Sequence, residues 1–156
     1  MQIVLFEPEI PPNTGNVARL CAAAGAELHL IEPLGFSIED KHLKRAGLDY
    51  WPHVAVTLWP SFAAYRDGAG KNKRLVMTSS RGGEAVHRFV FTADDALVFG
   101  PETRGLPGGI LALSPHAVHI PLRGVVRSLN LSTAAGIILY QALASSGLLD
   151  DTHELR

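Results

Sequence analysis

The chain has 156 residues, of which 47% are hydrophobic and 19% are charged, and its formal net charge is −1. This composition is that of a globular protein, and a chain of this length buries roughly 70% of its unfolded surface without a disulfide or a metal. The near-neutral charge excludes an overall positive field for nucleic acid but leaves room for a local basic patch. We expect a single domain over residues 1–156.

Cys21 is the one cysteine, so no disulfide can form within the chain. It lies in an apolar run, where we expect a small buried side chain and not a nucleophile. The first residues lack the basic stretch of a signal peptide, and no run approaches the roughly 20 apolar residues that span a bilayer. These features predict a reduced protein of the cytoplasm with no membrane partner.

Six short runs rich in Val, Ile, Leu and Phe predict strands in chain order. They cover residues 2–6, 27–31, 54–58, 74–78, 96–99 and 117–120. Between them, residues 16–25 and 130–147 repeat apolar side chains with a helical period. Gly25 and Gly147 are suited to end these helices, and Asn130 or Ser132 to begin the second. Strands that alternate with helices predict an α/β fold with a mainly parallel sheet flanked by helices.

Four loops that follow predicted strands are dense in glycine, proline and polar side chains. They comprise residues 7–16, 79–83, 100–107 and 121–130. Ligands of open parallel sheets bind beyond the carboxyl ends of the strands, where these loops gather. The loops therefore predict a binding site at that edge of the sheet.

Three segments of these loops carry candidate site residues. Residues 13–19 (Asn-Thr-Gly-Asn-Val-Ala-Arg) offer the free amides of a helix start and Arg19 to an anion. Residues 100–105 (Gly-Pro-Glu-Thr-Arg-Gly) place Glu102 where it can bind a ribose hydroxyl or orient an arginine, and residues 127–132 place Arg, Ser and Asn before a helix. Each segment, taken alone, also has a purely structural explanation: a capped helix for the first, a turn with an exposed ion pair for the second, and an N-cap for at least part of the third. No dinucleotide or P-loop glycine pattern, metal-binding histidine spacing or serine-hydrolase motif occurs, so we expect no metal.

In this order, residues 13–19, 99–106 and 120–132 resemble the three motifs of the SPOUT-class RNA 2′-O-ribose methyltransferases. Residues 6–12, 31–36 and 44–51 are similar to one branch of that class, which methylates the wobble nucleotide of tRNA, cytidine or uridine 34. The resemblance runs from about residue 2 to residue 147.

The resemblance implies a deep trefoil knot formed by the C-terminal segments, although threaded chains are nearly absent among known folds. It implies S-adenosylmethionine as methyl donor, S-adenosylhomocysteine as product, and tRNA, through its anticodon stem-loop, as substrate. It further implies a homodimer in which the partner subunit completes each active site, with no DNA partner.

The resemblance also implies roles for particular residues. Those that would contact the cofactor, largely through backbone groups, are Thr78, Gly100, Ile120, Ser128 and Leu129. Those that would act in catalysis are Arg19, assisted by Asn16, Glu102, Ser128 and Asn130. Because an arginine keeps its proton in proteins, we expect Arg19 to stabilise the developing alkoxide and to bind the RNA phosphate, while positioning does the rest.

The chain departs from the third motif of that class at two positions. Val126 stands where a serine is usual, and Thr133 where an asparagine is usual. Losing a hydroxyl can alter cofactor or RNA contacts, so two alternatives stay open. One is methylation of another tRNA or rRNA nucleotide, and the other is a non-catalytic module that binds RNA or cofactor.

Overall fold

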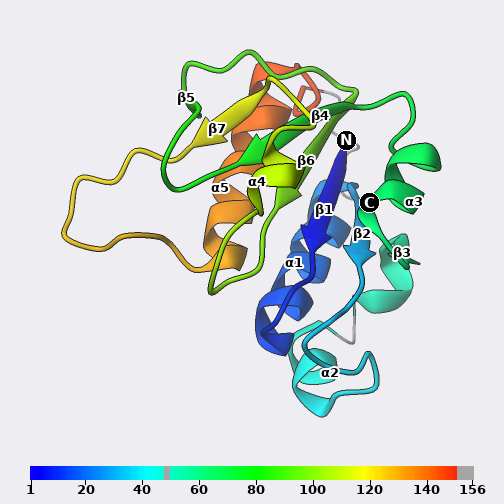
Figure 1. Ribbon diagram of the computed structural model, residues 1–156. Coiled ribbons are helices and arrows are strands. Elements are labelled where there is room, and N and C mark those ends of the chain that lie inside the picture. The colour runs from blue at the N-terminus through cyan, green and yellow to red at the C-terminus, as the bar shows by residue number, and fades with distance from the viewer. Residues whose placement is uncertain (48–49, 151–156) are drawn as a thin grey trace.

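The computed structural model describes residues 1–47 and 50–150, so residues 48 and 49 of the branch-like segment 44–51 lie outside the described residues. Within this part of the chain, parallel strands form one seven-stranded sheet in the order β3-β2-β1-β6-β4-β7-β5 (Figure 1). The strands are β1 (Gln2–Phe6), β2 (Glu27–Ile31), β3 (Val56–Trp59), β4 (Arg74–Thr78), β5 (Glu84–Ala85), β6 (Asp95–Phe99) and β7 (Ala117–His119). The predicted parallel sheet is confirmed.

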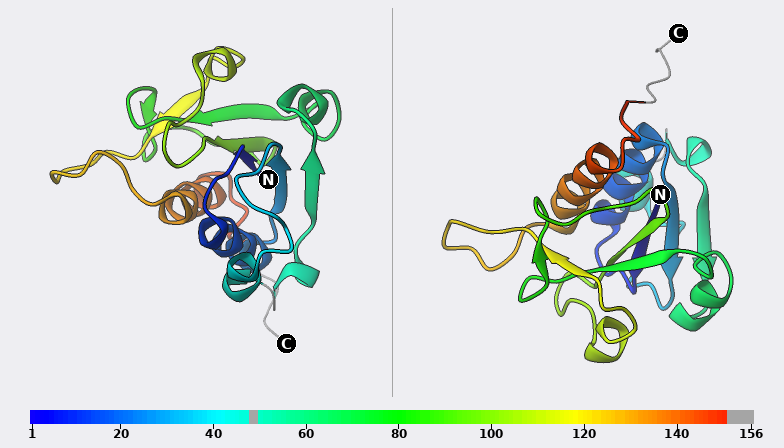
Figure 2. Two further views of the ribbon diagram at one scale, coloured as in Figure 1. Left: turned by 60° about the horizontal axis from the view of Figure 1, so that its bottom comes forward. Right: turned by 90° about the horizontal axis from the view of Figure 1, so that it is seen from above.

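Helices cover both faces of the sheet (Figure 2). They are α1 (Pro11–Ala24), α2 (Lys41–Gly47), α3 (Phe62–Asp67), α4 (Gly108–Leu111) and α5 (Leu131–Ser145), together with a 3-10 turn, η1 (Trp51–His53). Helices α1 and α5 pack on one face, and α3 and α4 lie on the other. In the described part of the chain, no helix is long and apolar enough to cross a membrane.

The two cores follow from the alternation of side chains along each strand. Leu5 and Leu97 of the sheet pack in one cluster with Cys21 of α1 and Leu139 of α5. Cys21 is fully buried, which confirms the prediction, and burial raises its pKa to about 12, as expected for a thiol in apolar surroundings. The second cluster, on the opposite face, includes Tyr65 of α3. Central strands buried on both faces explain the near-continuous apolar runs in the sequence.

Helix α1 begins earlier than the predicted segment 16–25, because Pro11 and Pro12 occupy its first turn, where a missing N–H has no helical partner to lose. Gly25 ends this helix with a φ of 65°, as predicted. Helix α5 is capped by Asn130, whose side chain accepts hydrogen bonds from the amides of Ser132 and Thr133. Of the two caps considered, Asn130 is therefore the one used.

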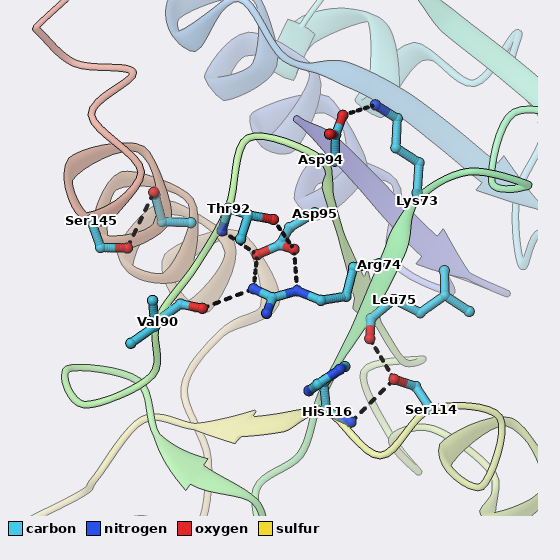
Figure 3. Close-up of polar contacts among 11 residues, drawn as sticks. Lys73, Arg74, Leu75, Val90, Thr92, Asp94, Asp95, Ser114, His116 and Ser145 are labelled. Carbon is cyan, nitrogen blue, oxygen red and sulfur yellow. Dashed lines mark hydrogen bonds and ion pairs between the residues drawn. The ribbon is translucent and has the colours of Figure 1, made fainter.

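A closed polar network joins β4 and β6 at their amino ends (Figure 3). The fully buried carboxylate of Asp95 accepts hydrogen bonds from Arg74 Nε at 2.6 Å and Arg74 Nη2 at 2.8 Å. Each of its oxygens also accepts one bond from Thr92, from the amide or the hydroxyl, at 2.9 Å. Hydrogen bonding to Asp95 raises the pKa of Arg74, whose guanidinium also donates to the carbonyl of Val90. The chain itself supplies four donors to the two oxygens of Asp95, so the hydrogen-bonding capacity of this carboxylate is used within the protein. We call this end of the sheet the closed end.

Candidate active site

A cavity of about 1100 Å³ lies at the opposite, carboxyl ends of β4, β6 and β7. The first turn of α1 and the start of α5 complete its walls. The chain runs outward from β1 through β2 to β3, whereas β6, β4 and β7 lie on the other side of β1. Such a reversal of strand order opens a crevice at the carboxyl edge of a parallel sheet. The cavity thus lies at the loop-rich edge of the sheet where the sequence predicts a binding site.

The cavity brings together seven of the nine predicted site residues. Its lining includes Thr78, Gly100, Glu102, Ile120, Ser128, Leu129 and Asn130. The other two, Asn16 and Arg19, do not line it and are exposed on α1. The guanidinium of Arg19 lies 4.7 Å from the centre of the Tyr50 ring, a cation–π contact. Within one chain, therefore, Arg19 faces Tyr50 and is not part of the cavity wall.

Glu102 connects the cavity wall to the residues that lead into α1. Its carboxylate accepts hydrogen bonds from the amides of Glu9 at 2.8 Å and Ile10 at 3.1 Å, and from Asn13 Nδ2 at 3.3 Å. Amides at the start of a helix have no acceptor within the helix, so a carboxylate there is stabilising. Glu102 thus has its oxygens occupied by donors from the chain.

Asn13 is a site residue to which sequence reasoning gave no role. It is 6% exposed, and because a carboxylate only accepts, its NH₂ group must face Glu102. Its Oδ1 then accepts from Asn130 Nδ2 at 2.9 Å, which leaves Asn130 Oδ1 to cap α5. A directed chain of hydrogen bonds thereby links all three motif segments. Spacing along the sequence carries no signal for a pair of amides 117 positions apart.

Gly100 sits where the loop after β6 folds back on itself. A Cβ atom at this position would lie 2.3 Å from the Leu106 amide nitrogen and 2.4 Å from the Gly105 carbonyl carbon. Only glycine fits this approach, which shapes the wall formed by residues 100–106. The neighbouring Thr78 donates its hydroxyl proton to the carbonyl of Val98 at 2.9 Å, so its side chain is fixed at the end of β4.

The charged side chains that line the cavity are mostly basic. They are Arg81, Arg104 and Arg127, against Glu102 alone. Arg104 is paired with Glu7 at 2.5 Å, and the Glu102 carboxylate is already engaged by N–H groups. Because Glu7 offsets Arg104, the excess positive charge at this site comes from Arg81 and Arg127. Sequence reasoning noted the loop of Arg81 but did not assign the residue to the site.

The two departures from the third motif lie outside the cavity lining. Val126, 59% exposed, is in the segment 121–130, which stands away from the body of the chain (Figures 1 and 2). Thr133 contributes its amide to the Asn130 cap, and its side chain is exposed. Neither substitution removes a hydroxyl from the cavity wall.

Comparison with known proteins gives a consistent result. Residues 1–140 match the model of the SpoU rRNA Methylase family. A tRNA (cytidine(34)-2′-O)-methyltransferase of Aeromonas hydrophila subsp. hydrophila is 44% identical over 157 residues, covering 99% of both chains. A structure solved for the 2-OH methylation of C/U34 on tRNA superposes with a TM-score of 0.88 at 49% identity, covering 92% of this chain and 94% of that one.

A more distant relative is the SpoU methyltransferase AviRb of Streptomyces viridochromogenes, solved in complex with AdoMet. It is 29% identical with a TM-score of 0.81, and the match covers 92% of this chain but 59% of AviRb. The parallel sheet, the three motif segments around one cavity and these matches lead to one assignment. The chain belongs to the SpoU rRNA methylase family.

Proposed function

We propose that this chain transfers a methyl group from S-adenosylmethionine to the ribose 2′-hydroxyl of tRNA nucleotide 34, a cytidine or uridine. The observation that carries the proposal is the meeting of three separated segments around one cavity at the carboxyl edge of the sheet. Near full-length similarity to proteins named for this reaction supports the substrate.

The cavity has the size and lining for a nucleoside cofactor. Its volume, about 1100 Å³, slightly exceeds the roughly 300–1,000 Å³ typical of ligand sites, which leaves room for a substrate nucleotide. Ile120 and Leu129 would pack against the adenine, and Gly100 lets the backbone approach the ligand. When bound, S-adenosylmethionine supplies a methyl group already activated by its sulfonium sulfur.

Ser128 and Asn130 would position the ribose, and their presence in the cavity lining supports this role. Arg19 would stabilise the alkoxide that develops on the 2′-oxygen, because a guanidinium donates hydrogen bonds but cannot take the proton. The exposed Asn16 lies on the same helix and would assist it. Because Arg19 does not line the cavity of its own chain, this role requires the second subunit of a homodimer.

The dimer is part of the proposal. Helix α5 leaves Ile137 41% and Tyr140 43% exposed, and the middle of the segment before it leaves Val125 and Val126 exposed. A second copy of the chain would cover these side chains and bring Arg19 of the partner subunit to the cavity. Two subunits would also join their arginine-lined cavities into one basic surface, so tRNA binding should weaken as salt increases. We further propose one domain over residues 1–156, the C-terminal knot and a cytoplasmic location.

The proposal is tested by incubating the protein with methyl-labelled S-adenosylmethionine and unmodified tRNA, and mapping the label by mass spectrometry. We expect label on the ribose of nucleotide 34. Ribose label at another nucleotide, of tRNA or rRNA, would show a different target. Cofactor binding without transfer to any RNA would favour a non-catalytic module and contradict the proposal.

A further inference from the structure

The short loop between β1 and α1 is held between two other loops at the carboxyl edge of the sheet (Figure 1). On one side lies the cavity wall of residues 100–106, and on the other lies the loop that follows β2. Glu9, in the middle of this arrangement, does not line the cavity. Its contacts are therefore not explained by a direct role toward a ligand.

Toward the cavity, Glu9 exchanges hydrogen bonds with two neighbouring wall residues. Its amide donates to Glu102 Oε2 at 2.8 Å, and its carboxylate accepts from the Thr103 amide at 3.0 Å and the Thr103 hydroxyl at 2.9 Å. Bonds thus run in both directions between segments more than ninety positions apart in the chain. We call the Glu9 carboxylate with the amide and hydroxyl of Thr103 the Glu9–Thr103 clasp.

Behind Glu9, Gly35 leaves no space for movement. The Gly35 amide donates to the carbonyl of Pro8 at 2.9 Å, and a Cβ atom on Gly35 would lie 2.8 Å from Glu9 Cα and 3.0 Å from its carbonyl oxygen. Glu7 has a φ of +46°, which non-glycine residues seldom adopt, and pairs with Arg104 of the wall at 2.5 Å. Uncommon backbone conformations persist where surrounding contacts determine them, and they cluster at functional sites.

We propose that Glu9, Thr103 and Gly35 are positioning residues that hold the cavity wall of residues 100–106 in the geometry that binds S-adenosylmethionine. This inference rests on the proposed function: Glu9 and Gly35 act on the same site from outside the cavity lining, through Thr103, which is part of the wall. The clasp is largely exposed, and exposed polar contacts contribute little to global stability. Its loss should therefore displace the wall without unfolding the chain, and small displacements of a site are enough to weaken ligand binding.

The direct test measures binding of S-adenosylmethionine by calorimetry for Glu9→Ala and Glu9→Gln. The alanine variant loses both bonds to Thr103, and we expect its Kd to rise about fivefold to tenfold. In the glutamine variant the amide oxygen accepts from the Thr103 amide, and the NH₂ group donates to the Thr103 hydroxyl. We expect its Kd to stay within about twofold of the original chain. In methyl transfer, the alanine variant should show a raised cofactor KM and a nearly unchanged kcat.

Two further pairs of variants test the clasp, one through Gly35 and one through Thr103. Gly35→Ala should raise the cofactor Kd because it pushes on Glu9, whereas Gly109→Ala, which has open space around its Cβ position, should not. Thr103→Val should raise the Kd and Thr103→Ser should restore it. Because both changes remove the same contact, Glu9→Ala combined with Thr103→Val should bind no more weakly than Glu9→Ala alone.

Cofactor affinity at the level of the unsubstituted chain in Glu9→Ala and Gly35→Ala would overturn the inference while leaving the proposed function intact. An equal loss of affinity in Glu9→Gln, or a loss that tracks a lowered melting temperature, would reduce the clasp to a structural contact and overturn it too. If Glu9→Ala fails to fold, Thr103→Val against Thr103→Ser decides the question. Failure of the unsubstituted chain to bind S-adenosylmethionine would refute the proposed function itself.

Discussion

The polar residues at the two ends of strands β4 and β6 differ in what they do: those at one end bond to one another, and those at the other border a cavity. At the amino ends, Arg74 and Asp95 are partners in the sheet register and satisfy each other, with Thr92 completing the bonds (Figure 3). At the carboxyl ends, Thr78 and Gly100 border a cavity of about 1100 Å³. Buried polar groups alone do not mark a site. What marks one is polar and glycine-rich backbone that surrounds space left for a ligand.

The largest effect should come from the closed end. Asp95→Ala leaves the guanidinium of Arg74 and the donors of Thr92 without their acceptor, and we expect the free energy of unfolding to fall by about 3 kcal/mol. Urea unfolding measures this change. The control is Asp94→Asn, because Asp94 pairs with Lys73 but its side chain is 78% exposed, and its loss should be below about 1 kcal/mol. Equal losses of unfolding free energy in the two variants would show that the buried network adds no more stability than the exposed ion pair.

At the open end, Gly100→Ala should act on binding. The added Cβ meets the backbone of residues 105 and 106 and forces the wall to move, at a cost of about 2 kcal/mol, or roughly thirtyfold in cofactor Kd. Calorimetry on the folded variant measures this cofactor Kd. Gly108→Ala has no atom within 4 Å of its new Cβ and should bind as the unsubstituted chain does. An unchanged cofactor Kd in Gly100→Ala would show that this cavity is not the cofactor site.

Arg19→Ala tests whether α1 takes part in the reaction. We expect turnover to fall by roughly tenfold or more while the cofactor Kd stays within about twofold, because the proposed role of Arg19 is toward the ribose 2′-oxygen and the RNA phosphate and not toward the cofactor. Methyl-transfer kinetics and calorimetry give the two numbers. Arg45→Ala removes an exposed arginine from α2 and serves as the control. Unchanged turnover in Arg19→Ala would remove this residue from the mechanism.

The smallest effect concerns a second closed network, between β2 and β3. His29 Nδ1 accepts from Trp59 Nε1 at 3.1 Å, so its other nitrogen carries the proton and lies 3.2 Å from Glu27 Oε2. Burial lowers the pKa of His29 from its ordinary value of 6.5, so below that pH the unfolded chain binds more protons than the folded one. The free energy of unfolding should therefore decrease as pH falls below about 6.5.

Urea unfolding at a series of pH values checks this dependence. In His29→Phe the part of the slope that belongs to His29 should disappear, whereas His42→Gln, which removes an exposed histidine of α2, should retain it. Methyl-transfer activity at pH 7 should be the same in His29→Phe as in the unsubstituted chain, because His29 does not line the cavity. An identical pH slope in His29→Phe would assign the effect to other groups.

Sequence patterns were sufficient for the elements that are long or have clear ends. The predicted strands 2–6, 27–31 and 74–78 coincide with β1, β2 and β4, and Gly25 and Asn130 end and begin helices as expected. Strand β5 was missed because two residues show no periodicity, and its pairing with β7 exists only in the folded sheet. Helices α3 and α4 are too short for a clear apolar period.

The site was predictable to the extent that its residues occur in loops with distinctive composition. Gly100 and Ser128 belong to such segments, but their cofactor roles, and that of Ile120 at the end of a predicted strand, came from the family resemblance; all three line the cavity. Asn13 was not given its role, because its two partners lie 89 and 117 positions away in the chain. Arg19 was expected in the site, but which surface a helical side chain faces depends on packing, here against Tyr50.

The central claim is methyl transfer to one hydroxyl group of one nucleotide. Two tRNA transcripts, identical except that nucleotide 34 carries ribose in one and 2′-deoxyribose in the other, test it most directly with labelled S-adenosylmethionine. We expect label in the ribose-containing transcript and none in its deoxy counterpart. Equal labelling of both transcripts, or of neither while the cofactor binds, would contradict it.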